Sequence, residues 1–219
     1  MDRFHRLINI WCAPKHPPIH TCFIFILCIV VFETDSNVHL SIPLDPEEQF
    51  YNYFGTAVSH FSTSHLGANL SGIILFGTLL EIVHGTAASI FVYWISAVSG
   101  VLAEAKWNTG NVRYTGASSG VYGFVGAYLS HILLNWTEAP LRCLWVGFLL
   151  LQGIEVGVLL LYDEEYKQTI AHFSHLIGFV QGICVGLITL RNLRVLRCEI
   201  WLQCIGVVVS ATIIIVSII

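Results

Sequence analysis

The sequence predicts an all-α protein, a polytopic bundle of membrane-spanning helices. Only 11% of its 219 residues are charged, whereas soluble domains carry about 25%. Apolar residues make up 55% of the chain, and the mean hydropathy is +0.73. They fall in runs of helix length, which is typical of chains that cross a lipid bilayer. The net charge of −4, with only 10 Lys and Arg residues, argues against nucleic-acid binding.

Seven apolar runs, bounded by charged residues, Pro or Gly, predict seven transmembrane helices. They cover residues 19–32, 65–84, 86–105, 118–136, 141–162, 170–190 and 200–219. The first run is short, and we interpret it as a signal anchor because no convincing small-residue cleavage site follows it. We expect three parts: an N-terminal segment over 1–18, a transmembrane core over 19–192 that includes a long loop at 33–64, and a linker with the seventh helix over 193–219.

The distribution of Lys and Arg predicts the orientation, because cytoplasmic loops retain these residues. With the N-terminus in the cytoplasm, seven of the ten are cytoplasmic: Arg3, Arg6, Lys15, Arg142, Arg191, Arg194 and Arg197. The loop at 33–64 carries five acidic residues and no Lys or Arg, so we expect it on the luminal or extracellular side. Seven spans then place the C-terminus on that side as well.

Polar residues within the predicted spans concentrate at one membrane level. Ionisable side chains are costly inside a bilayer and therefore indicate function. Asn69 follows His65 by four residues and so lies on the same helical face. The predicted orientation brings three groups to the luminal side: His60, His65 and Asn69 at the second span, Gly116 to Gly120 at the fourth, and His172 and His175 at the sixth.

The short apolar stretch of the fourth span predicts that Ser118, at its start, meets water inside the bilayer. From Ser118 its apolar stretch lasts only to about Leu129, which is shorter than a full crossing. We therefore expect residues 106–117 to dip into the membrane as a non-helical loop, which must be buried in protein or line a water-filled cavity.

Glycines predict close packing between the fourth and sixth spans, because small residues let two helix backbones approach closely. They are Gly178, Gly182 and Gly186, spaced by four residues in the sixth span, and Gly120 and Gly123 in the fourth. Packing of these faces would bring Ser118 within hydrogen-bond reach of His175, which could then activate the hydroxyl. The alternative is that the glycines only pack and that His175 is an interface histidine.

The sequence lacks the residues that a zinc-dependent or a paired-aspartate mechanism of peptide hydrolysis in a bilayer would require. The sequence has no HExxH motif for a zinc protease, and no aspartate lies in a predicted span. His172 and His175 could share a metal with His60 or His65, but no carboxylate within a span is placed to complete the site, so we expect no metal. A serine nucleophile needs a histidine base and N–H donors for the oxyanion, and no cofactor.

Four ordered motifs resemble the rhomboid family of intramembrane serine proteases. His60, His65 and Asn69 are similar to its HxxxxHxxxN segment, and Gly77 with Glu81 to its GxxxE. Residues 116–122, Gly-Ala-Ser-Ser-Gly-Val-Tyr, resemble its GxSG turn. His175, Gly178 and Gly182 match its AHxxGxxxG helix, with Ser174 in place of the usual Ala. The resemblance covers residues 51–192, about two-thirds of the chain.

The resemblance implies a role for each matching residue. Ser118 would be the nucleophile and His175 the general base. The side chains of His65 and Asn69, with the backbone N–H of Ser118, would bind the oxyanion. The supporting residues would be Gly116, which lets the loop approach closely, Tyr122, which packs against the His175 ring, and Gly178. We interpret Glu81 and Glu155 as hydrogen-bond partners in helix packing.

The resemblance further implies an integral membrane endopeptidase of the secretory pathway or plasma membrane, with six core helices and one more at the C-terminus. Its substrates would be single-span membrane proteins, cut near the luminal end of their transmembrane segment. Two other classes remain open: a non-catalytic rhomboid-like protein that binds membrane clients, and a transporter that uses the luminal histidines as a proton relay. Tyr51 and Asn52 stand where the family commonly has a Trp-Arg pair, which indicates a different anchoring of the loop.

Overall fold

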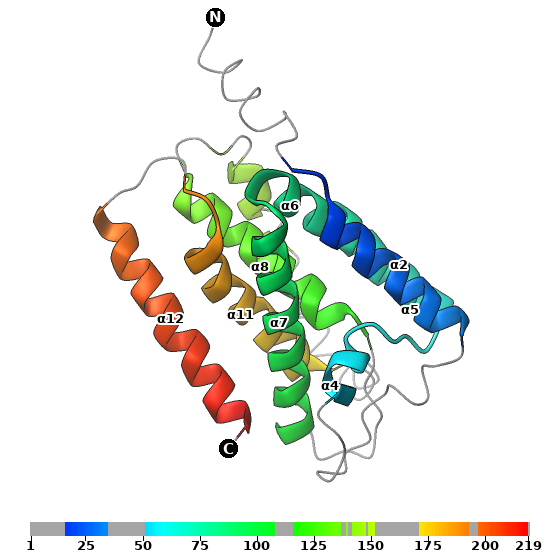
Figure 1. Ribbon diagram of the computed structural model, residues 1–219. Helices are drawn as coiled ribbons and strands as arrows, with labels where there is room; N and C mark the ends of the chain where they lie inside the picture. Colours follow the sequence, from blue (N-terminus) through cyan, green and yellow to red (C-terminus); the bar gives the residue numbers. More distant parts are fainter. Residues whose placement is uncertain are drawn as a thin grey trace, which may run out of the picture.

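The computed structural model describes residues 16–34, 51–107, 116–136, 139, 142–147, 149–151, 171–192 and 197–218. Within these ranges every regular element is a helix (Figure 1), which confirms the predicted all-α bundle. By length and composition, four of the described helices could cross a membrane: Thr63–His84, Thr86–Trp107, His172–Thr189 and Ile200–Ile218. Two shorter apolar helices cover Ile19–Glu33 and Arg142–Leu151.

The elements follow the predicted spans closely. In chain order they are α2 (Ile19–Glu33), α4 (Tyr51–Thr56), α5 (Thr63–Gly72), η1 (Ile73–Gly77), α6 (Thr78–His84), α7 (Thr86–Trp107), α8 (Ser118–Leu134), α11 (His172–Thr189) and α12 (Arg197–Ile218). Six of the seven predicted spans correspond to these helices, with ends that differ by a few residues. The fifth is helical at 142–147 and 149–151, and its remainder lies outside the described residues, as do 1–15, 35–50 and 108–115.

The short helix α4 lies within the predicted loop at 33–64. One expectation about the loops needs correction: the predicted non-helical loop at 106–117 begins too early, because Lys106 and Trp107 still belong to α7. Lys106 lies in the last turn of α7, and its Nζ donates to the carbonyl of Val216 in α12, at 2.6 Å, as cations do at helix C-termini.

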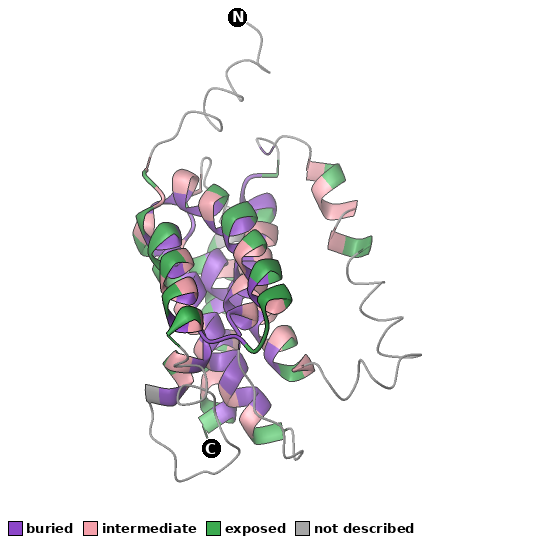
Figure 2. Ribbon diagram, turned by 90° about the vertical axis from the view of Figure 1, so that its right-hand side faces the viewer, coloured by how far each residue is buried: buried purple, intermediate pink, exposed green. Residues whose placement is uncertain are grey.

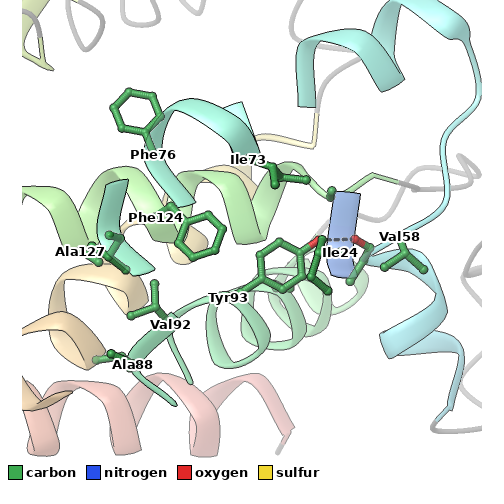
Figure 3. Packing of buried hydrophobic residues seen from close by; sticks show 14 of the residues in the cluster. Ile24, Val58, Ile73, Phe76, Ala88, Val92, Tyr93, Phe124 and Ala127 are labelled. Carbon is green, nitrogen blue, oxygen red and sulfur yellow. Dashed lines mark hydrogen bonds between the residues drawn. The ribbon is translucent and has the colours of Figure 1, made fainter. Parts of the chain in front are cut away.

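The centre of the bundle is formed by α7, α8 and α11, which pack against one another, and α12 lies on the outer side of α11 (Figure 1). Buried residues gather inside the bundle and exposed ones on the outward faces of the helices (Figure 2). Tyr93 of α7 is fully buried and its hydroxyl donates to the carbonyl of Ala57 at 2.7 Å. Its ring lies among Ile24, Val58 and Phe124 (Figure 3), which joins α7 to the segment after α4.

The glycines of α8 and α11 bring the two backbones together, as predicted. A Cβ atom on Gly178 would lie 2.5 Å from the carbonyl oxygen of Ser119, and one on Gly182 would meet the carbonyl oxygen of Gly123. The missing side chains of Gly120 and Gly123, however, face α7 and not α11 as predicted: Gly120 faces the ring of Tyr93, and Gly123 faces Ser96. Helical spacing places Gly120 on the surface of α8 that a neighbour approaches, but the aromatic ring on α7 fills that space.

The second predicted span contains a π-helical turn, η1, that the sequence did not predict. Gly72 precedes it and Gly77 is its last residue, and α8 approaches the span closely at both. A Cβ atom would lie 2.5 Å from Val121 Cγ1 if it stood on Gly72, and 2.8 Å from the Phe124 ring if it stood on Gly77. Such turns are rare and often occur at functional sites.

Glu81 of α6 caps the N-terminus of α2. Its side chain is fully buried, and its two oxygens accept the backbone N–H groups of His20 at 2.9 Å and Thr21 at 2.8 Å, and the Thr21 hydroxyl at 2.6 Å. The residue at the N-cap of α2 is Pro18, which has no side-chain acceptor. A carboxylate satisfies first-turn N–H groups and interacts favourably with the helix dipole. This agrees with the interpretation of Glu81 as a helix-packing partner.

Candidate active site

A sharp turn before α8 brings Ser118 to the first position of that helix. Gly116 has φ +140°, a conformation that side chains with a Cβ rarely adopt. A Cβ atom there would lie 2.7 Å from His65 Cε1, so the close approach of the two segments also requires glycine. The N–H of Gly116 donates to the carbonyl of Thr56 at 3.0 Å, which fastens the turn to the end of α4.

His175 lies in the first turn of α11 and contacts Ser118. The distance between His175 Nε2 and Ser118 Oγ is 2.9 Å. When the hydroxyl donates this bond, Nε2 carries the lone pair and the ring proton is on Nδ1. Both residues are only partly buried. This is the geometry in which an imidazole can remove the proton of a nucleophilic hydroxyl.

Tyr122 and Gly178 hold His175 in place. The Tyr122 ring, one turn after Ser118, stacks on the imidazole with ring centres 4.5 Å apart and an interplanar angle of 21°. Gly178, three residues after His175, packs directly on the backbone of Ser119. The helix that carries His175 therefore lies in close backbone contact with the helix that carries Ser118.

His65 and Asn69 lie on α5, next to the turn. His65 is beside Gly116, as the glycine geometry shows. Asn69 is buried, and its Nδ2 donates to the carbonyl of His65 at 3.1 Å. A side-chain amide has two N–H donors, and this bond within the helix uses one of them.

His60 lies in the segment before α5 and is fully buried. Its ring packs edge-on against His65, with centres 5.2 Å apart, and its Nε2 faces the N–H of Ala117 at 3.5 Å. The pKa of His60 is lowered to about 4, first by burial and then by the nearby charge of His65. A hydrogen bond with the backbone of Val58 acts in the opposite direction and raises this pKa. The ring is therefore neutral at pH 7 and supports the turn that precedes Ser118.

The loop before α5 is anchored without the Trp-Arg pair of the family pattern. The carbonyls of Thr56 and Ala57 accept hydrogen bonds from Gly116 and Tyr93, as described above. Phe54 packs against Trp94 of α7, with ring centres 5.8 Å apart. Backbone carbonyls and one aromatic contact thus fasten this segment to α7 and to the turn.

The roles of three residues near Ser118 were not predicted from the sequence. The hydroxyls of Ser119 and Ser174 are hydrogen-bonded to each other, and Glu104 Oε2 accepts the N–H of Ser174 at 2.8 Å. Two signals could have found them: Ser119 stands at the second glycine of the GxSG pattern, and Glu104 is an ionisable residue inside the predicted third span. In the described part of the chain, no three His, Cys, Asp or Glu side chains gather as metal ligands do.

The fold and this site define a polytopic helical protein with a serine and a histidine paired at one end of the bundle. The family model described as the Rhomboid domain matches residues 47–192. Because this match covers about two-thirds of the chain, the chain belongs to the rhomboid family.

Similar proteins come from animals and plants. The chain is 32% identical to human "Rhomboid-related protein 3" over 66% of its own length and 37% of that protein. It is 31% identical to "RHOMBOID-like protein 6, mitochondrial" of Arabidopsis thaliana, over 61% of the chain and 41% of the relative. It is 30% identical to "Rhomboid-related protein 1" of Caenorhabditis elegans, over 64% and 40%. The chain thus spans about two-fifths of the length of these curated relatives.

Proposed function

We propose that this chain is an intramembrane serine endopeptidase that cleaves single-span membrane proteins with a Ser118–His175 dyad. The observation that carries the proposal is the 2.9 Å contact between Ser118 Oγ and His175 Nε2. Membership of the rhomboid family and the partial exposure of both side chains support it.

The proposed reaction has two halves. In the first, Ser118 Oγ attacks the peptide carbonyl while His175 Nε2 takes its proton. The tetrahedral intermediate collapses, the C–N bond breaks, and the imidazolium gives the proton to the leaving amine. In the second half, His175 takes a proton from water, the hydroxide attacks the acyl-enzyme ester, and the proton returns to Ser118 Oγ. The stacked Tyr122 ring keeps the imidazole oriented through both halves.

The oxyanion in this proposal is bound by His65, Asn69 and the backbone N–H of Ser118. Ser118 is the first residue of α8, and the first N–H groups of a helix have no intrahelical acceptor and lie at the positive end of its dipole. His65 lies beside Gly116, two residues before Ser118. Each donor of such a site typically contributes about 10²–10³ in rate.

The length of α8 fits hydrolysis below the membrane surface. Its 17 residues correspond to about 25 Å, whereas the hydrocarbon core is about 30 Å thick. We propose that the N-terminus lies in the cytoplasm and that Ser118 lies towards the luminal side, in the secretory pathway or plasma membrane. A single-span substrate would then be cut near the luminal end of its transmembrane segment.

The test is co-expression with a panel of tagged single-span membrane proteins, followed by detection of released fragments. Ser118→Ala and His175→Ala should each abolish cleavage while the protein remains folded and in the membrane. Ser71→Ala, a change in an exposed serine whose hydroxyl only donates to the carbonyl of Gly67, is the matched control and should cleave as the wild type does.

Cleavage that persists in both dyad variants would contradict the proposal. Client proteins that co-purify equally with wild type and Ser118→Ala, together with no labelling of the wild type by a fluorophosphonate, would indicate a non-catalytic binding protein. Solute uptake that survives the double replacement would indicate a transporter.

A further inference from the structure

Glu104, near the end of α7, caps the helix that carries His175. The side chain is 1% exposed and its Oε2 accepts the N–H of Ser174 at 2.8 Å. Ser174 is the third residue of α11, and His175 N–H makes the first intrahelical bond, to the carbonyl of Ala171. The N-cap residue, Ala171, has no side-chain acceptor of its own. Glu104 therefore supplies from α7 the oxygen that an Asp or Ser at the N-cap would normally provide.

The same network reaches the helix that carries Ser118. The Ser174 hydroxyl is hydrogen-bonded to the Ser119 hydroxyl, and both side chains are buried. Ser119 directly follows Ser118, and Ser174 directly precedes His175. The chain Glu104–Ser174–Ser119 thus joins three helices through the immediate neighbours of the two paired residues.

Gly100 allows this junction to form. It lies one turn before Glu104 on α7, and a Cβ atom there would be 2.6 Å from the carbonyl oxygen of Ser174 and 2.8 Å from Ser119 Oγ. The three backbones consequently meet at one point. A shift of α8 or α11 at this point would change the distance between Ser118 and His175, and α7 contacts both helices there.

A purely structural cap elsewhere in the molecule provides a comparison. Glu81 binds the first turn of α2 in the same way, with three hydrogen bonds. It lies at the opposite end of the bundle, and its partners His20 and Thr21 are far along the chain from both Ser118 and His175. Loss of either carboxylate should therefore cost stability, but only loss of the Glu104 carboxylate should alter the Ser118–His175 geometry.

We infer that Glu104 is a positioning residue of the reaction proposed above, and the inference rests on that proposed function. By capping α11 at Ser174, and through Ser174 holding Ser119, it fixes the spacing and direction of His175 relative to Ser118. The negative charge is not the essential property; the essential property is an oxygen acceptor at this point.

The experiment measures the rate constant for labelling of Ser118 by a fluorophosphonate in detergent, expressed per folded molecule, with the melting temperature as a second reading. Glu104→Ala should slow labelling by about 10- to 100-fold, the scale of an ångström-sized displacement of a catalytic group. Glu104→Gln keeps an oxygen acceptor and should restore most of the rate. Glu81→Ala should lower the melting temperature and leave the labelling rate per folded molecule unchanged.

Ser174→Ala keeps the N–H that Glu104 binds and removes only the link to Ser119, so its labelling rate should fall between those of wild type and Glu104→Ala. Equal labelling of wild type and Glu104→Ala would overturn the positioning role and leave the proposed function standing. Equal losses in Glu104→Ala and Glu81→Ala would also overturn it, because they would reflect folding alone. A wild type that is not labelled at all would overturn the proposed function and the inference together.

Discussion

The two ends of α8 each have a histidine stacked on a tyrosine, but the groups that face the histidine differ. At the Ser118 end, His175 contacts Ser118, and the Tyr122 ring stacks on the imidazole. At the other end, which we call the His84 end, His84 Nε2 and His131 Nδ1 are 2.7 Å apart. There the Tyr128 ring stacks on His131, with centres 5.5 Å apart and an interplanar angle of 29°. Each end therefore pairs a histidine with a stacked tyrosine.

The difference lies in what faces the imidazole nitrogens. His84 Nδ1 accepts the N–H of Arg191 at 2.9 Å, so its proton is on Nε2 and is donated to His131. Both rings of this pair are at least 94% buried. An apolar cavity of about 210 Å³ opens beside them, and its described lining includes no Ser, Thr or Cys. A histidine can act as a base where its lone pair faces the proton of an accessible reacting group, and the described residues form that arrangement at the Ser118 end.

Replacing the histidine at each end should give the largest contrast. His175→Gln removes the proposed base, whose contribution is about 10²–10⁴ in rate. His84→Gln leaves buried polar groups without their partners and should cost about 1–3 kcal/mol of stability, with cleavage per folded molecule unchanged. Cleavage of a membrane reporter, together with thermal unfolding, measures both. Similar losses of cleavage per folded molecule in the two variants would show that the ends do not differ in function.

Substitutions in the glycine stripe of α11 should sharpen the contrast with a smaller effect. A Cβ atom on Gly178 would lie 2.5 Å from the Ser119 carbonyl, near the dyad, and one on Gly186 would lie 2.9 Å from Ser130 Cβ, towards the other end. Overpacking of this kind costs about 1–3 kcal/mol, so Gly178→Ala and Gly186→Ala should both lower the melting temperature.

Only Gly178→Ala should also slow fluorophosphonate labelling, by up to about 100-fold, because it moves His175 away from Ser118. Gly67→Ala is the control, since a Cβ atom there would meet nothing within 4 Å. A larger decrease in the labelling rate of Gly186→Ala than of Gly178→Ala would contradict this prediction.

The remaining expected effect is a pH dependence at the Ser118 end that concerns stability alone. The pKa of His60 is lowered from 6.5 to about 4 by burial, so the unfolded chain binds a proton between these values that the folded protein does not. Stability from the neutral ring is complete above pH 6.5 and is lost as the pH falls towards 4, by up to about 3 kcal/mol.

His60→Asn keeps an acceptor for the N–H of Ala117 but does not titrate in this range. Unfolding in denaturant at pH 7, 5.5 and 4.5 should therefore show a shallower decline for the variant than for the wild type. Parallel declines would mean that His60 is protonated as readily in the folded protein as in the unfolded chain.

The spans, and the contact that a glycine stripe marks, could be predicted from the sequence. Apolar runs located the spans, and the positions of Ser118 and His175 at span ends, together with the stripe that includes Gly178, predicted the contact between them. These inferences depend on one helix at a time and on the small size of glycine. The predicted roles of His65 and Asn69 in binding an oxyanion remain predictions.

Where no glycine stripe marks the facing surface, partners on other helices could not be predicted in this way. Glu104 caps α11 from α7, and Glu81 caps α2 from α6, but helical periodicity gives no information on which neighbour a face meets. The same limit explains Gly120, which packs on Tyr93 and not on α11. The rotation of each helix about its axis depends on the complete set of contacts, and no local sequence pattern contains it.

The π-helical turn η1 determines in which directions the side chains before and after it point relative to each other. At about 100° per residue, Asn69 and Glu81, which are 12 positions apart, would point about 120° away from each other on a continuous α-helix. A π turn accommodates one additional residue and reduces this angle to about 20°. Both side chains can then be buried, as they are, one beside the Ser118 end and the other at the start of α2. The extra residue rotates the second half of the helix relative to the first, so that one helical span directs polar side chains inward at both of its ends.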